Sequence, residues 1–398
     1  MTKRRSNGEG CVYKESRSGR WVGKFVIGYN SNGDRKYKTC RGKTEKEVIA
    51  KLKGLTEKHH AGINISSNGL KVGEFFEDWF YNSAIHGLRT STSQSYEMII
   101  RRHIKPHLGD ILLSELSSRD LQTFYNYLYS DGRTDGKGGL AVKTVENIHL
   151  LISSGINFAL KEGIIIRNPL LNVRLRREGK KEVEAFTREE QQRIIEECKN
   201  HYYGMAYKFD FYTGLRAGEL LGLTWDCVNF TNNTIRVNKQ VQRNKNFSTT
   251  AKNKTILGFV HNTKTETSTR TIKVLPQIMQ ELAEYKKKQD ILKHRIGKNY
   301  YKYDLVFPRQ DGYFTDTATF LDNFSKIQKK LDIPHRNVHA MRHTFATRAL
   351  ESGIKPIVVS RLLGHASIQI TLDIYGHVIP DFVEHELEKL EKLYYYKK

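Results

Sequence analysis

The stretches TGLRAGELLGL (213–223), HAMRHTFATRAL (339–350) and LLGHASIQITLDIYGH (362–377) lie far apart in a chain of 398 residues. With one lysine between the first two, they supply a set of side chains that suits a single reaction: Arg216, Lys264, His339, Arg342, His365 and Tyr375. Two guanidiniums can hold a phosphate, a lysine and two histidines can move protons, and a phenol can attack. This combination predicts phosphodiester transfer without a metal ion.

Glu219 follows Arg216 by three residues and is expected on the same side of a helix, where its carboxylate can hold the guanidinium. His339 and Arg342 have the same spacing, which places them on one helical face. His339 and His343 stand four apart, as in a zinc helix, but Ala340 replaces the glutamate of that motif and Arg342 would set a cation beside the metal. The sequence therefore predicts no metal and no bound cofactor.

The charge of the chain indicates a polyanionic partner. The formal net charge is +23 and the pI about 9.7, with 66 Lys and Arg against 43 Asp and Glu. Sixteen of the basic residues and six of the acidic ones fall within residues 1–60. Each phosphate that such a surface neutralises releases condensed counterions, so nucleic acid is the expected partner. A basic protein without such a partner is the alternative.

Cysteine usage and hydropathy indicate a reducing, cytoplasmic setting. The four cysteines are isolated and form no Cys-x-x-Cys pair, which argues against a zinc module and a disulfide scaffold. The N-terminus MTKRRSNGEG has no apolar signal region, and no run approaches the ~18 apolar residues of a membrane span.

Residues 1–62 predict a small domain made of a three-stranded sheet and a helix. Strands are expected at GCVYK (10–14), GRWVGKFVIGY (19–29) and RKYKTCR (35–41), with a hairpin turn at Asn32-Gly33. A helix over 44–59 would pack behind the sheet through Val48, Leu52 and Leu55. The side chains expected to contact DNA are Arg20, Lys24, Arg35, Lys36 and Lys38. A solvated basic face on an accessory domain is the alternative.

Residues 66–176 predict a helical domain. Four segments have helical spacing or end signals: 72–84, 91–109, 116–132 and 142–163. Arg101, Arg102, His103 and Lys105 form a basic cluster suited to phosphate contacts. The charged run RLRREGKKEVEAF (174–186) then predicts an exposed hinge.

Residues 185–398 predict a mostly helical domain that starts with a capped helix at 187–198 and has one strand region near 233–275. HNTKTETSTRTIKVL (261–275), which contains Lys264, is expected to be a β-hairpin whose turn carries Thr and Ser. The tail DFVEHELEKLEKLYYYKK (381–398) predicts an amphipathic helix, which docks either on its own domain or on a neighbouring protomer.

The three stretches resemble the tyrosine recombinase (phage-type integrase) family over residues ~185–380. The helical segment before them resembles the core-site-binding domain of that family. The N-terminal unit is similar to the arm-site-binding domain of integrases from phages and conjugative transposons. The resemblance implies a mainly α, multidomain α+β fold with a mixed α/β catalytic domain.

The resemblance also implies roles for the six residues. Arg216 and Arg342 would bind the scissile phosphate, and Lys264 would protonate the departing 5′ oxygen. His339 would accept the tyrosine proton or bond the phosphate, His365 would donate to a non-bridging oxygen, and Tyr375 would be the nucleophile. Lys252, Lys254 and Lys273 lie near Lys264, so a solvated basic hairpin is the alternative for that lysine.

The implied activity is site-specific recombination through a 3′-phosphotyrosine intermediate and a Holliday junction, which integrates or excises a mobile element. The implied partners are double-stranded DNA with core and arm sites, three further copies of the chain in a homotetramer, an excisionase and a host DNA-bending protein. A type IB topoisomerase is the enzymatic alternative, and a DNA-binding regulator without catalysis is the other. Whether the element is a phage or a conjugative transposon stays open.

Overall fold

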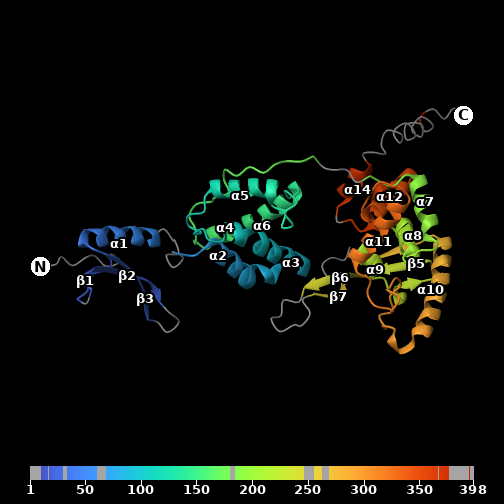
Figure 1. The fold of residues 1–398 in the computed structure, drawn as a ribbon, viewed down its shortest axis with the longest axis horizontal. Helices are drawn as coiled ribbons and strands as arrows, with labels where there is room; N and C mark the ends of the chain where they lie inside the picture. The colour runs from blue at the N-terminus through green and yellow to red at the C-terminus, as the bar shows by residue number, and fades with distance from the viewer. Residues whose placement is uncertain are drawn as a thin grey trace. The chain divides into compact units, whose positions relative to one another are not determined.

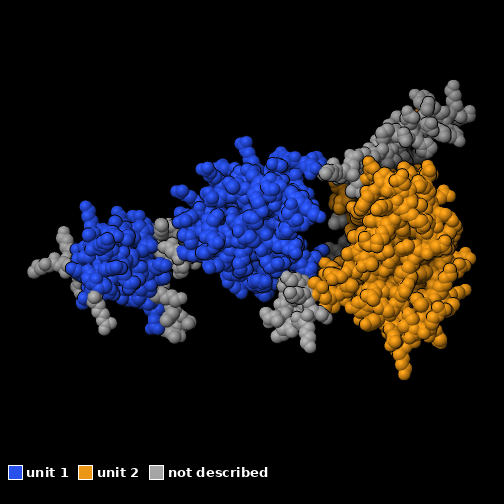
Figure 2. Space-filling view, in the orientation of Figure 1, with its two compact units in different colours: residues 1–179 blue, residues 180–398 orange. Residues whose placement is uncertain are grey.

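The computed structural model describes residues 10–16, 18–29, 34–60, 69–179, 184–245, 255–261, 269–365, 367–375 and 394. The chain forms two compact units, residues 1–179 and 180–398 (Figures 1 and 2). Within the first unit, the buried apolar residues form one small cluster at the N-terminal sheet and a larger one among the helices that follow. The further division at residues 62–66 stays a prediction.

The N-terminal part is an antiparallel sheet backed by one helix (Figure 1). The strands, in the order β1-β2-β3, are β1 Cys11–Lys14, β2 Trp21–Tyr29 and β3 Arg35–Gly42, and the helix is α1 Glu45–His60. Phe25 of β2 and Leu52 of α1 are buried against each other's elements. The predicted three-stranded sheet with a helix is confirmed. The Asn32-Gly33 turn lies outside the described residues.

The helical part follows the predicted segments. Its elements are α2 Val72–Trp79, η2 Phe80–Ala84, η3 Ile85–Gly87, α3 Thr90–Ile99, η4 Ile100–Ile104, α4 Lys105–Leu108, α5 Ser118–Asp131 and α6 Val142–Lys161. Ser117 caps α5 through a reciprocal pair of bonds with Asp120. The apolar stripes of α2, α5 and α6 meet in one core, where the Phe76 ring is fully buried against Gly155 of α6.

The second unit combines helices with two small sheets. Its helices are α7 Arg188–Cys198, α8 Gly204–Thr213, α9 Ala217–Leu221, α10 Pro276–Ile296, α11 Thr317–Lys330, α12 His339–Glu351, α13 Pro356–Leu363 and α14 Ile368–Tyr375, with short η5 Trp225–Cys227 and η7 Gly297–Asn299. Its strands are β4 Val228–Asn229, β5 Thr234–Val237, β6 Lys239–Lys245, β7 Thr255–His261 and β8 Arg270–Lys273.

Residues 262–268 of the predicted hairpin over residues 261–275 lie outside the described residues, so the hairpin stays a prediction. Of the described strands on either side, β7 pairs with β6, whereas β8 pairs with β5 in a separate sheet of order β4-β5-β8. The strand pattern was correct, but pairing between strands is a tertiary property that local alternation does not encode.

No helix among the described residues is long and apolar enough to cross a membrane.

The contact between α2 and α6 gives a test of the helical core. A Cβ at position 155 would lie 2.4 Å from Cε1 of Phe76, a ring with no exposed surface. Gly155→Ala should therefore destabilise this part by about 1–3 kcal/mol through overpacking, despite the better helix propensity of alanine. Ser154→Ala, at the adjacent exposed position, is the matched control. Urea unfolding followed by circular dichroism measures both, and equal stability of the two variants would contradict this packing.

Candidate active site

Three arginines from three distant parts of the sequence end on the last carbonyl groups of α13. Arg270 donates from Nε to the Leu362 oxygen at 2.9 Å. The next two carbonyls are taken in the same way, Leu363 by Arg342 Nη2 at 2.7 Å and Gly364 by Arg216 Nη2 at 3.2 Å. The final carbonyls of a helix have no partner within it and carry its partial negative charge, so guanidiniums satisfy them in both respects.

Glu219 is the anion at the centre of this group. Its buried carboxylate accepts from Arg216 Nη1 at 3.0 Å and from both terminal nitrogens of Arg270 at 3.1 and 2.7 Å. Burial alone would raise the pKa of Glu219, but the bonds and charge of Arg270, followed by those of Arg216, lower it to about 2. The predicted contact between Glu219 and Arg216 is confirmed.

Arg342 is almost completely buried, whereas Arg216 keeps 44% of its side chain exposed. Arg342 also donates from Nη1 to the Gly214 oxygen at 2.8 Å. Burial and the charge of Arg216 lower the pKa of Arg342 to about 9, which leaves the guanidinium cationic at neutral pH. The guanidiniums of Arg216 and Arg342 therefore lie side by side, although they come from distant parts of the sequence, and that of Arg216 faces solvent.

Two glycines in the left-handed conformation make this convergence possible. Gly214 (φ 60°) ends α8, and a Cβ there would lie 2.7 Å from both Leu363 and Phe345 side chains. Gly364 (φ 65°) ends α13, and its Cβ would lie 3.0 Å from Nη1 of Arg270. Any other residue would be strained at these positions and would displace α13 from the arginines.

His339 and His365 lie beside these cations. His339 is the first residue of α12, and part of the residue is exposed to solvent. The protein atoms that cover the rest of its ring, followed by the charge of Arg342, lower its pKa. His365 follows Gly364 directly, and burial, then Arg342 and Arg216, lower its pKa to about 4. Its Nδ1 is 2.8 Å from the hydroxyl of buried Thr371, which fixes the ring and leaves Nε2 for another partner. Both imidazoles are neutral at neutral pH.

The structure defines the backbone position of Tyr375 but not its side chain. Tyr375 is the final residue of α14, the helix that directly follows His365 and packs against α12 and α13. Lys264 lies outside the described residues. The structure therefore brings Arg216, His339, Arg342 and His365 together and sets the chain at Tyr375 on a helix joined to them.

Arg270, Thr371 and Asp210 belong to this site but were missed in the sequence. Arg270 lies in the quoted stretch 261–275, and a basic residue within the alternating TRTIK pattern of a strand was the available signal. No local pattern marks Thr371. Asp210 is an acid among apolar residues in KFDFYTG, which is a usable signal for a buried charge.

The comparisons with known proteins agree with this geometry. Residues 184–381 match the Phage integrase family, and residues 71–129 match the Phage integrase, N-terminal SAM-like domain. A tyrosine recombinase XerC-like protein of Caldanaerobacter subterraneus is 30% identical over 93% of this chain and 95% of its own length. The chain belongs to the phage integrase family of tyrosine recombinases.

Solved structures show the same fold. The Tn1549 transposon integrase in complex with a circular intermediate DNA aligns with a TM-score of 0.66 at 21% identity, over 81% of this chain and 99% of that one. A lambda integrase dimer bound to a COC′ core site aligns with a TM-score of 0.54 at 16% identity, over 94% of this chain and 96% of that one. The predicted multidomain α+β fold is confirmed.

In this recombinase, the N-terminal basic residues separate onto the two faces of the sheet. Lys24 pairs in register with Thr39, and its ammonium lies 4.3 Å from the centre of the Tyr37 ring, on the face away from α1. Arg35 and the unpredicted Arg41 share that face by strand alternation. Lys38 pairs with Phe25 and lies on the face of α1 instead. Arg20 is exposed before β2, and the side chain of Lys36 is not described.

Arg101, Arg102 and Lys105 of the predicted basic cluster are exposed, whereas His103 is buried, so its inclusion was wrong. Arg101 and Lys105 each contact a carboxylate, Glu97 at 3.3 Å and Glu77 at 2.7 Å, while Arg102 is exposed beside them. These surface ion pairs are weak and can be exchanged for phosphate contacts at small cost.

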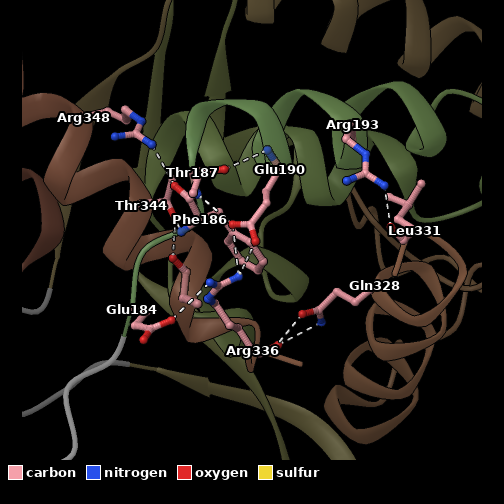
Figure 3. Close-up of polar contacts among 11 residues, drawn as sticks. Glu184, Phe186, Thr187, Glu190, Arg193, Gln328, Leu331, Arg336, Thr344 and Arg348 are labelled. Atoms are coloured by element: carbon pink, nitrogen blue, oxygen red, sulfur yellow. Dashed lines mark hydrogen bonds and ion pairs between the residues drawn. The ribbon is translucent and has the colours of Figure 1, made fainter. Parts of the chain in front are cut away.

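The chain enters the catalytic part through a strap, residues 184–187, that is bonded to the rear of α12 (Figure 3). The buried Phe186 donates its N–H to Thr344 Oγ1 at 2.9 Å and accepts from Arg348 Nη2 at 2.7 Å. Thr344 in turn donates to the Ala340 oxygen, one residue after His339. The strap therefore fixes the helix that carries His339 and Arg342.

Arg336 holds this strap from the other side (Figure 3). Its guanidinium binds Glu190 at 3.0 Å and Glu184 at 3.2 Å and lies 5.1 Å from the centre of the Phe186 ring. Its backbone N–H and carbonyl are both bonded by the side chain of Gln328. The turn before α12 and the strap are thus joined through one side chain.

We expect Arg336→Ala to lower the free energy of unfolding by about 2–4 kcal/mol, because it leaves Glu190, which is 16% exposed, without its cation. Arg188→Ala is the matched control, since that side chain is 79% exposed and its pairing with Glu351 contributes about 0–1 kcal/mol. Urea unfolding of the full chain measures both, and equal losses would show that the strap does not depend on Arg336.

The histidines give a second expectation. In ring-proton NMR titrations of the free protein, His365 should titrate far below its ordinary pKa, with a midpoint near 4. Saturating sulfate should raise that midpoint, because an anion between Arg216 and Arg342 favours the imidazolium. His365→Gln assigns the signal, and a midpoint at or above 6.5 without anion would refute the described environment.

Proposed function

We propose that this recombinase cleaves and rejoins DNA strands at specific sites through Tyr375, at the cationic site at the end of α13. The observation that carries the proposal is the placement of Arg216, Arg342 and His365 around the Leu363–Gly364 carbonyls. Tyr375 follows ten residues later on α14. Three separate chain segments thereby supply one phosphate-sized set of donors.

In the first step, the Tyr375 oxygen attacks phosphorus and its proton passes to His339, whose lowered pKa leaves the imidazole neutral and therefore able to accept a proton. The P–O5′ bond breaks, and Lys264 supplies a proton to the departing 5′ oxygen. A 3′-phosphotyrosine bond has then replaced one phosphodiester bond. A 5′-hydroxyl of another strand reverses these steps and restores the tyrosine, so no external energy source is needed.

The arginines stabilise the pentacovalent phosphorus. Arg342 uses two of its N–H groups on carbonyls and retains others for non-bridging oxygens. Arg216 is partly exposed and can do the same from the solvent side. His365, held at Nδ1 by Thr371, donates from Nε2 to an oxygen in the tautomer that carries the proton there. Charge neutralisation by guanidiniums takes the part that a metal ion plays in other phosphotransferases.

Binding of DNA uses two further surfaces in this proposal. The sheet face with Lys24, Arg35 and Arg41 contacts arm-type sites, and Arg101, Arg102 and Lys105 contact core sites. Four protomers would assemble on two duplexes and exchange strands through a Holliday junction. An excisionase and a host DNA-bending protein remain predicted partners, and the predicted location is the cytoplasm, on the nucleoid when bound.

Tyr375→Phe should retain DNA binding and form no covalent protein–DNA adduct, because it removes the attacking oxygen alone. Bound fragments selected from genomic DNA with this variant give the target sequence, and a nicked suicide substrate that carries it traps the adduct on denaturing gels. Tyr394→Phe is the matched control, since that tyrosine is 78% exposed.

Adducts that persist in Tyr375→Phe would overturn the assignment of the nucleophile. Loss of adducts from the wild type on addition of a chelator would overturn the metal-free step. Sequence-independent relaxation of supercoiled plasmid by a monomer would favour a type IB topoisomerase instead.

A further inference from the structure

A second buried carboxyl group, Asp210, lies behind the arginines and has no part in the steps above. Asp210 is in the last turn of α8 and has no exposed surface. Neither of its carboxyl oxygens makes a hydrogen bond of normal geometry to any protein group that the structure describes, although the Leu215 backbone N–H slightly favours the anion. A buried carboxylate without a partner is far more costly than the neutral acid.

Asp210 is connected to Arg342 through the backbone. The Gly214 N–H donates to the Asp210 carbonyl at 2.8 Å, and the Gly214 carbonyl accepts from Arg342 Nη1 at 2.8 Å. The groups that act on the Asp210 carboxyl are Arg342 from α12, Glu219 from α9 and the Leu215 amide. Burial raises the pKa of Asp210 well above its ordinary value, Arg342 opposes this, and Glu219 reinforces it.

The two buried acids of the site are therefore in different states. Glu219 has two arginine partners, which favour its ionised form, whereas Asp210 has none, which favours its neutral form. A second carboxylate near the first would be opposed by like-charge repulsion in a dehydrated environment. Among the described residues of the site, the neutral histidines add no charge, so three guanidiniums face a single carboxylate and leave a surplus of two positive charges. Lys264, the proposed donor to the 5′ oxygen, lies outside the described residues.

That surplus matches the reaction in the proposed function, on which the following inference rests. A phosphodiester carries one negative charge, and its pentacovalent transition state carries two. If Asp210 were ionised, it would become a competing anion for Arg342 and would halve the surplus. We propose that Asp210 is a positioning residue that stays protonated, so that Arg342 remains available to the phosphate and the site keeps the charge of its transition state.

Thermal unfolding tests the proton without any DNA. An acid that is protonated in the folded protein and ionised in the unfolded chain makes the wild type lose stability as pH rises above about 3.8. Asp210→Asn has no such dependence. The variant should therefore melt at a higher temperature than the wild type at pH 8, and the gap should be smaller at pH 5. Asp322→Asn, on the exposed face of α11, is the matched control and should show no pH-dependent gap.

Two results would overturn the proposal: a difference in melting temperature between Asp210→Asn and the wild type that does not grow with pH, or a variant that melts below the wild type by more at pH 8 than at pH 5. Either result means that Asp210 is ionised in the folded protein. The result holds whether or not the chain forms adducts, so this experiment and the Tyr375→Phe experiment can fail separately.

Adduct formation on the suicide substrate gives the functional readout. Asp210→Asn should stay active to higher pH, with its alkaline midpoint raised by about one unit or more, because it cannot become an anion beside Arg342. DNA binding, measured in the Tyr375→Phe background, should not change. A tenfold or greater loss of adduct rate at every pH, with binding retained, would show that a carboxylate at position 210 is required and would also overturn the proposal.

Discussion

The carbonyl groups of Leu362, Leu363 and Gly364 end helix α13, and each accepts a hydrogen bond from a different arginine. The three arginines come from β8, α12 and the start of α9. The end of α13 therefore connects strand β8 to helices α9 and α12. It also sets His365 next to the cations, because that residue follows Gly364 directly. The guanidiniums donate hydrogen bonds to these carbonyls, and the partial negative charge of the helix end stabilises the guanidiniums.

Placing three guanidiniums together would be unfavourable without an anion, and Glu219 supplies it. Its carboxylate holds Arg216 and Arg270 and stays ionised in a dehydrated position. Because Glu219 also accepts from the Arg216 backbone N–H at 3.1 Å, it caps α9 and fixes the start of the helix at the same time. The same bonds that stabilise the fold therefore orient the cations, so the proposed phosphate site is preorganised without DNA.

The strap on the opposite side of α12 gives this helix a second support. Phe186 is bonded to Thr344 and Arg348, and Thr344 is bonded to the first turn of α12. The strap and the first turn of α12, which begins at His339, are therefore joined by hydrogen bonds through Thr344.

The sequence by itself determined the helices, the strands and most of the site chemistry, because periodicity, caps and residue types are local properties. The pair Arg216 and Glu219 could be predicted, since three residues on a helix fix their relative position. The tertiary structure alone decided that β8 pairs with β5 rather than β7, which brings Arg270 to Glu219. It alone also decided that Glu219 has a second arginine partner while Asp210 is buried with no side-chain hydrogen bond, because Arg270 lies 51 residues from Glu219 in the sequence and burial depends on packing between distant segments.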